Sequence, residues 1–300
     1  MYSPRSNGEN MTSRLAVAVL LISLVPACKS IKDLAAQGAD AGVTTPSVVA
    51  DTKITEVTFV RKVPKVGTKV DTATKTAFKF TFEGKIYRES SEDAAQVTVQ
   101  GSDEFRVTKA SIEVKQLYTT KQEGTGDEKK SVNPLAGSRF IVSRSDDGKL
   151  SALDSGGAKV IPLQLAQIQE HFATVFDADK TQEFLPKRPV KIGEKLIPSS
   201  DAVLKLLGQK DDGNTTIDGV EFILQTATPE LATFAVTMTF TQKLNPKVRL
   251  RAKLEGTLDV RPKDSAITSI DVKGPLNLLD PGGNDKGTGD LTFKGTETFL

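Results

Sequence analysis

Cysteine, histidine and tryptophan are nearly absent from this sequence, and each scarcity excludes a class of site. The 300 residues include one Cys, one His and no Trp. A single cysteine cannot form a disulfide within the chain or a dithiol redox pair. One cysteine and one histidine cannot supply the ligands of a structural zinc site. We therefore expect neither a metal nor a cofactor.

An excess of charge of one sign is also missing. The chain has 40 basic and 38 acidic residues, which leaves a formal net charge of +2. Such a balance produces no strong field to attract a polyanion. The sequence therefore predicts no nucleic-acid partner.

Long hydrophobic runs are scarce, and the clearest one lies near the amino terminus. It extends from Leu15 to Val25 and is preceded by Arg14. The run is too short to cross a bilayer core of about 30 Å, but it has the length of a signal-peptide core. It ends in Val25-Pro26-Ala27-Cys28, which resembles the lipobox of bacterial lipoproteins, where a small residue precedes the acylated cysteine. The chain's one cysteine stands at that position.

This resemblance implies a signal peptide over residues 1–27, with Met1 or Met11 as the start, and a lipidated Cys28. Two or more acyl chains hold a protein firmly at a membrane. Lys29 stands where inner-membrane lipoproteins of this class usually have Asp, so the resemblance favours the outer membrane, on its periplasmic or surface face. Residues 28–52 are rich in small residues and predict a flexible tether. The alternatives are a secretory signal with an incidental cysteine and a membrane-anchor helix.

Residues 53–300 predict a β-rich domain. From Phe234 to Thr241 and again from Arg249 to Val260, apolar residues alternate with polar ones across a turn at Asn245-Pro246, which is typical of an antiparallel hairpin with one buried face. At about 3.3 Å per residue each arm is roughly 40 Å long, so the strands must twist. Similar alternation at 54–59, 78–82 and 105–118 predicts a mainly β (α+β) fold, as a long curved antiparallel sheet or half-barrel.

Two short helices are expected to cover the concave face of this sheet. Apolar residues recur at helical spacing from residue 163 to 177, with Pro162 at the first turn. A second helix contains Leu204 and Leu207, begins after Ser199 or Ser200 and ends at Gly208.

Two segments are similar enough to suggest an internal duplication. Residues 64–70 and 190–196 agree in residue class at nearly every step. Two pseudo-repeats, 53–160 and 188–300, joined by the helix 163–177, would explain this similarity. Chance similarity between turns is the alternative.

Six phenylalanines of the predicted strands are expected on the inner face of the sheet. This face is either packed core or the lining of a hydrophobic cavity that accepts an acyl chain. The residues are Phe78, Phe80, Phe82, Phe234, Phe240 and Phe293. The architecture resembles the LolA/LolB/LppX-type half-barrel carriers, whose strands wrap over helices. The resemblance implies a lipid or lipoprotein ligand and assigns no functional residues.

Two other functions stay open at this point. A structural or interaction lipoprotein without a pocket would act through its Lys- and Thr-rich outer strand faces. A hydrolase would need other groups to converge on the one histidine, His171, which falls on the polar face of its helix and is expected to face solvent. No nucleophile-elbow pattern accompanies it. We therefore expect a non-enzymatic envelope lipoprotein that binds a lipid.

Overall fold

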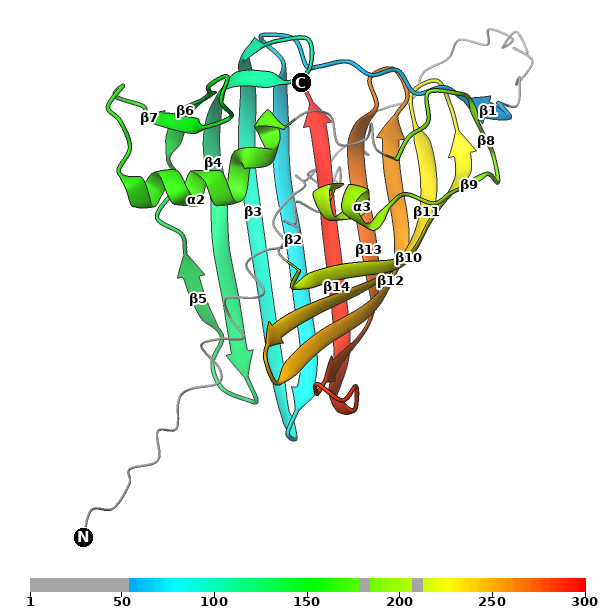
Figure 1. Cartoon of the computed structure of the whole chain (residues 1–300). Helices are drawn as coiled ribbons and strands as arrows, with labels where there is room; N and C mark the ends of the chain where they lie inside the picture. Colours follow the sequence, from blue (N-terminus) through cyan, green and yellow to red (C-terminus); the bar gives the residue numbers. More distant parts are fainter. Residues whose placement is uncertain (1–53, 178–183, 207–212) are drawn as a thin grey trace, which may run out of the picture.

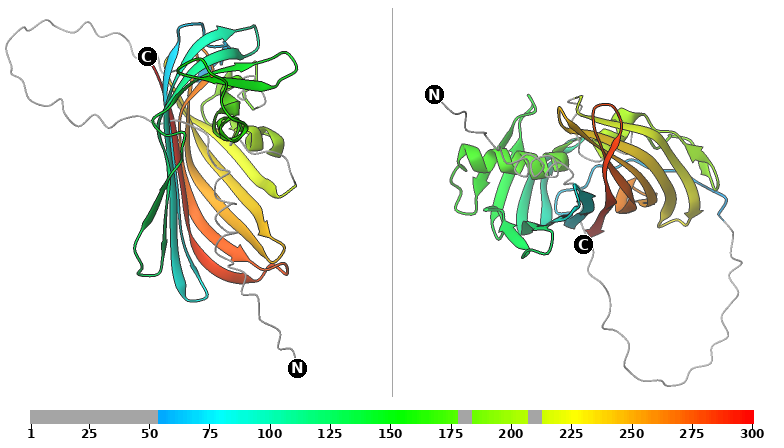
Figure 2. Two further views of the ribbon diagram at one scale, coloured as in Figure 1. Left: turned by 90° about the vertical axis from the view of Figure 1, so that its left-hand side faces the viewer. Right: turned by 90° about the horizontal axis from the view of Figure 1, so that it is seen from below.

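The computed structural model describes residues 54–177, 184–206 and 213–300. The predicted signal peptide, Cys28 and the tether lie outside the described residues, as do Leu207 and Gly208 of the second predicted helix. The described part is a long curved antiparallel sheet with the helices on its concave side (Figures 1 and 2).

A single large sheet contains most of the strands. In chain order the elements are β1 (Glu56–Val57), β2 (Lys69–Phe82), β3 (Lys85–Ser102), β4 (Val107–Glu123), β5 (Lys129–Val132), β6 (Arg139–Arg144), β7 (Leu150–Asp154), α2 (Pro162–Phe172), the 3₁₀ helix η1 (Ala173–Phe176), β8 (Val190–Lys191), β9 (Lys195–Leu196), α3 (Ser200–Leu206), β10 (Thr215–Ala227), β11 (Ala232–Asn245), β12 (Val248–Arg261), β13 (Ala266–Leu279) and β14 (Asp285–Phe299). The 12-stranded sheet has the order β7-β6-β4-β3-β2-β14-β13-β12-β11-β10-β9, with β5 beside β4. It is not closed into a barrel.

The predicted fold class is confirmed, and the hairpin of β11 and β12 is its clearest part. The two strands are each 14 residues long and pair from Ala232 opposite Val260 to Asn245 opposite Val248. In β12 the even-numbered residues from Val248 to Leu254 are buried while the odd-numbered ones are exposed. This alternation places one apolar face on the core, as the sequence pattern requires.

The carboxyl-terminal half of the sheet bends sharply where β12 and β13 meet. Their ladder is interrupted between the pairs Ala252–Leu276 and Glu255–Lys273, beside Gly274 and Pro275. A Cβ atom at Gly274 would overlap the carbonyl oxygen of Lys253. Proline has no N–H to donate to the ladder, and glycine allows the backbones to approach closely. These two residues therefore permit the curvature that turns the sheet into a half-barrel.

Both predicted helices are present. Pro162 starts α2, which continues as η1 to Phe176, close to the predicted end at residue 177. The N–H of Ala202 donates a hydrogen bond of 3.2 Å to the side chain of Ser199, which caps the first turn of α3. Ile168, Phe172 and Phe176 are buried in a core cluster with strands β3, β4, β6 and β7. α2 therefore packs on the amino-terminal half of the sheet.

Several strands were missed or misplaced by the sequence pattern. The 18 residues of β3 were not predicted, because polar side chains occupy its inward positions up to Asp93 and the alternation becomes apolar only from Ala95 onward. Phe105, predicted in a strand, lies in the turn between β3 and β4 and is 67% exposed. Strand β10 was also not predicted.

The two predicted repeats contribute adjoining parts of one sheet, which meet where β2 pairs with β14. Their similar turns make the same backbone hydrogen bonds. Gly67 and Gly193 both have positive φ, and their N–H groups donate to the carbonyls of Val99 and Leu224. These carbonyls belong to the strand that pairs with the one after each turn. The duplication itself stays a prediction.

Residues 58–68 form a strap along the upper edge of the sheet in Figure 1, from β1 to β2. Val60 ties the strap to the β12–β13 turn, since its N–H donates 2.8 Å to the carbonyl of Pro262 and its carbonyl accepts 3.0 Å from the Ser265 hydroxyl. The strap therefore leads from β1 to β2 in the middle of the sheet and is fixed to the β12–β13 turn on its way.

Candidate functional site

The six phenylalanines proposed to line a cavity lie instead in or beside packed core. Phe78, Phe234, Phe240 and Phe293 are at most 4% exposed and belong to the main core cluster, which spans β2 and β10–β14. Phe80 and Phe82 are partly buried against that cluster, and Phe80 stacks on Tyr87 with ring centroids 5.1 Å apart. None of the six lines the cavity described next. Residues of the strap, of the segment 184–185 and of α3 also pack into this cluster and help to fill the inner face.

The structure contains a cavity of about 570 Å³ beneath η1 and the end of α2. Its floor is the inner face of β2 and β3, and its remaining walls are the strap, the β3–β4 turn and the ends of β12–β14. Val70, Val97, Val99, Phe172 and Phe299 provide apolar surface. The volume lies within the range of about 300–1,000 Å³ that is usual for small-molecule sites.

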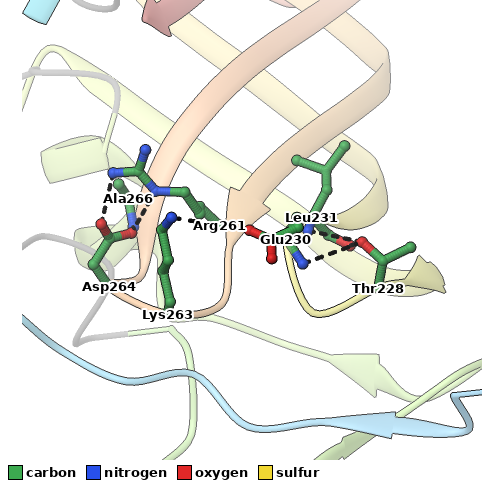
Figure 3. Close-up of polar contacts among 7 residues, drawn as sticks. All are labelled: Thr228, Glu230, Leu231, Arg261, Lys263, Asp264 and Ala266. Carbon is green, nitrogen blue, oxygen red and sulfur yellow. Dashed lines mark hydrogen bonds and ion pairs between the residues drawn. The ribbon is translucent and has the colours of Figure 1, made fainter. Parts of the chain in front are cut away.

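The rim of the cavity is polar and carries charges of both signs. Lys62, Lys65 and Lys263 are exposed there, and four acidic residues also line the cavity. Figure 3 shows the turn between β12 and β13, where Lys263 lies 3.9 Å from a carboxylate oxygen of Glu230. Exposed pairs of this kind contribute little to stability. The rim lysines are therefore available to anionic groups near the opening.

Arg261 is fixed at this rim by two contacts. Its guanidinium donates two hydrogen bonds, of 2.8 and 2.6 Å, to the carboxylate of Asp264 (Figure 3). The same group lies 3.8 Å from the centroid of the Phe299 ring. A bidentate ion pair keeps its geometry well when the guanidinium also stacks on an aromatic ring. Arg261 and Phe299 therefore form a rigid part of the wall.

The deep end of the cavity holds His171 and Asp93. Nδ1 of His171 is 3.9 Å from Oδ2 of Asp93, and the two side chains are 7% and 20% exposed. Burial lowers the pKa of His171 from 6.5 to about 4 and raises the pKa of Asp93 from 3.8 to about 7. Burial disfavours the charged form of both groups. Burial therefore favours the uncharged imidazole of His171 and the protonated carboxyl group of Asp93.

The expectation of a solvent-exposed His171 was wrong. The residue is 8% exposed because it shares the buried side of α2 with Ile168 and Phe172, which packs on the sheet, while Glu170 is exposed. The sequence pattern gave no strand at β3, so nothing in it placed Asp93 opposite the helix. Asp93 is itself one of the polar residues that hid β3, so the local pattern held no signal for this site.

An arginine of β6 positions η1 above the cavity. Arg144 donates hydrogen bonds of 2.8 Å to the carbonyl of Phe176 and 2.9 Å to the carboxylate of Asp177. Because Phe176 is fully buried, the end of η1 is fixed by both packing and a charge-assisted bond. This anchoring holds Val175 and Asp177 against the cavity.

The arrangement around His171 is not that of an assembled hydrolytic triad. Within the described ranges, neither ring nitrogen of His171 has a hydrogen-bond partner, so no hydroxyl nucleophile is bonded to the imidazole. A triad requires a nucleophile on one nitrogen and an orienting group on the other. In the same part of the chain, no group of three or more His, Cys, Asp or Glu residues is placed to hold a metal ion.

None of the helices in the described ranges is both long and apolar enough to cross a membrane.

No protein-family model matches the chain, and no curated protein matches it. Among solved structures, it is similar to a structure of lipid–protein interactions in lipovitellin, with 10% identity, a TM-score of 0.39, and coverage of 79% of this chain and 26% of that chain. It is also similar to DynF from the dynemicin biosynthesis pathway of Micromonospora chersina, with 13% identity, a TM-score of 0.21 and coverage of 86% and 92%. A DUF1329 family protein from Desulfovibrio piger has 10% identity, a TM-score of 0.14 and coverage of 76% and 84%. The chain thus spans about a quarter of the lipovitellin chain, and likenesses at these scores carry no argument about function.

Proposed function

We propose that this protein is a non-enzymatic envelope lipoprotein that binds a lipid chain in the cavity between β2, β3 and η1. The observation that carries the proposal is the cavity of about 570 Å³ with its apolar walls. Burying an apolar chain there gains about 25 cal/mol for each Å² removed from water. The exposed lysines of the rim suit a lipid-covered surface, where anionic head groups are common.

Filling the cavity tests this function. Ala95 is 3% exposed and lines the cavity on β3, so Ala95→Phe places a ring in the space of the ligand. We expect native mass spectrometry of the protein purified from membranes to find lipid on the parent and at least about ten times less on the variant, a loss of about 1.4 kcal/mol in affinity.

Thr98→Phe is the matched control, because it adds the same ring to β3 at a position that does not line the cavity. We expect this variant to keep the bound lipid. Equal lipid on the Ala95→Phe protein would argue against the cavity as the binding site and favour an interaction lipoprotein that uses no pocket.

The proposal places the protein at the outer membrane through acyl chains on Cys28. Cys28→Ala removes the only thiol of the chain, and with it the site of acylation. We expect the variant to leave the membrane fraction and to take up no labelled palmitate, because the anchor contributes about 0.8 kcal/mol per buried methylene. Fractionation and metabolic labelling measure both effects. A variant that partitions with membranes as fully as the parent would contradict the proposed acyl anchor. It would leave the proposal of lipid binding in the cavity unchanged.

A further inference from the structure

The imidazole of His171 is an unusual group in the lining of a cavity that binds lipid chains. It is more than nine-tenths buried and lines the cavity, yet neither of its nitrogens has a hydrogen-bond partner in the described part of the chain. Leaving a buried donor or acceptor unsatisfied costs about 1–3 kcal/mol. Buried polar groups are normally paired, so these two nitrogens require an explanation. A ligand group that bonds to one of them would supply a partner for that nitrogen.

The neighbourhood of His171 restricts the charge of that group. Asp93 is the nearest carboxyl group, and among the described residues no Lys or Arg forms an ion pair with it. A second negative charge here would be buried beside an uncompensated carboxyl group, which is costly. A neutral imidazole offers one N–H donor and one acceptor nitrogen. The site therefore suits an uncharged group that donates and accepts, such as a hydroxyl.

The shape of the cavity indicates how a bound ligand is oriented. From Asp93 to Val99 the floor follows β3 over about 20 Å, at about 3.3 Å per residue. The surface changes along this path from the polar groups of His171 and Asp93 to the apolar side chains of Ala95, Val97 and Val99. Phe105, 67% exposed, lies at the far end. A chain with its polar end at His171 would match this gradient.

We propose that His171 and Asp93 form a hydrogen-bonding subsite for the hydroxyl end of a long-chain, alcohol-type lipid, which binds with that end inward. The inference rests on the lipid-binding function proposed above and adds the class and orientation of the ligand. His171 bonds the hydroxyl directly, and Asp93 accepts or donates the second hydrogen bond according to its protonation.

The test compares three probes that share one saturated chain: a fatty alcohol, its methyl ether and the corresponding fatty acid. Each probe displaces a fluorescent acyl reporter from the full chain carrying Cys28→Ala, so that no attached acyl chain competes. We expect the alcohol to bind about tenfold more tightly than the ether, because only the alcohol can donate to the site. At pH 8 the fatty-acid carboxylate should bind more weakly than the alcohol.

Two variants of His171 make the test specific. His171→Phe removes both nitrogens and should abolish the preference for the alcohol while the ether still binds. His171→Gln restores a donor and an acceptor and should retain most of the preference. Equal binding of alcohol and ether to the parent would overturn the subsite but leave lipid binding intact. The subsite would also be overturned if the fatty acid bound most tightly and lost this advantage on Lys62→Ala or Lys65→Ala. Such a result would place the polar end of the ligand at the rim. Failure of all three probes to bind would overturn the proposed function with it.

Discussion

Gly274→Ala is expected to destabilise the protein by about 3 kcal/mol or more, among the largest effects of any single methyl group in this chain. The added Cβ would overlap the backbone carbonyl of Lys253 on the neighbouring strand, where no flexible side chain is able to yield. Overpacking a well-packed site typically costs about 1–3 kcal/mol, and a clash with backbone reaches the upper end or beyond. Relief would require β12 and β13 to separate at the bend that closes the half-barrel.

Urea unfolding followed by circular dichroism measures this loss. Lys273→Ala is the matched control, since Lys273 is the preceding residue of β13 and its side chain is exposed. We expect the control to stay within about 0.5 kcal/mol of the parent. If Gly274→Ala proved as stable as the control, the close approach of the two strands, and the origin of the bend proposed here, would be wrong.

Asp93→Asn and His171→Phe are expected to change the pH dependence of stability in opposite directions. The folded pKa of Asp93 is raised from 3.8 to about 7, so its contribution to stability is fully present below about pH 4 and is lost as the pH rises through about 7. The folded pKa of His171 is lowered from 6.5 to about 4, so its contribution is present above about pH 6.5 and is lost as the pH falls through about 4. In the parent the two trends largely cancel.

Removing either group exposes the trend of the other. Relative to the parent, Asp93→Asn should gain stability as the pH rises from 4 to 7, and His171→Phe should gain stability as the pH falls over the same window. Each slope should approach about 1 kcal/mol per pH unit. Arg261, Asp264, Glu297 and the rim lysines surround the cavity in every variant, so their titration cancels in the difference from the parent.

Free energies of unfolding at four pH values between 4 and 7, measured for the parent and both variants, test this expectation. Asp264→Asn is a useful comparison, because its carboxyl group is paired with Arg261 at the rim and not beside His171. Parallel curves for Asp93→Asn and His171→Phe would mean that burial does not set the protonation of the two groups.

The hairpin of β11 and β12 could be predicted because its information is local. From Phe234 to Thr241 and from Arg249 to Val260 the polarity of the residues indicates which face each one occupies, and a period of two fixes the backbone that allows it. The start of α2 at Pro162 could be predicted for the same reason, since the preference for proline at the first turn of a helix depends on no contact elsewhere in the chain. For elements of this kind the sequence pattern and the packing agree.

β3 and the cavity could not be predicted in the same way. The inward positions of β3 include Glu89, Ser91 and Asp93, which read as a polar segment because a strand signal requires apolar residues on one face. These side chains face inward because β3 pairs with β2 and β4, and the inner faces of those two strands fix the orientation of β3. Such pairing joins positions that are distant in sequence. For the six phenylalanines both packed core and a cavity lining stayed open, since an apolar face does not reveal whether other parts of the chain fill the space in front of it.

By itself the sequence determined that this protein is mainly β, that β11 and β12 pair as a long hairpin, and that two short amphipathic helices accompany the sheet. These features follow from period, turn residues and capping, each of which acts over a few residues. Only the tertiary structure decided where the cavity lies, that His171 is buried and that Asp93 is its neighbour. Burial and pKa depend on atoms that β3, α2 and the strap bring together, and a local sequence pattern contains no information about such contacts.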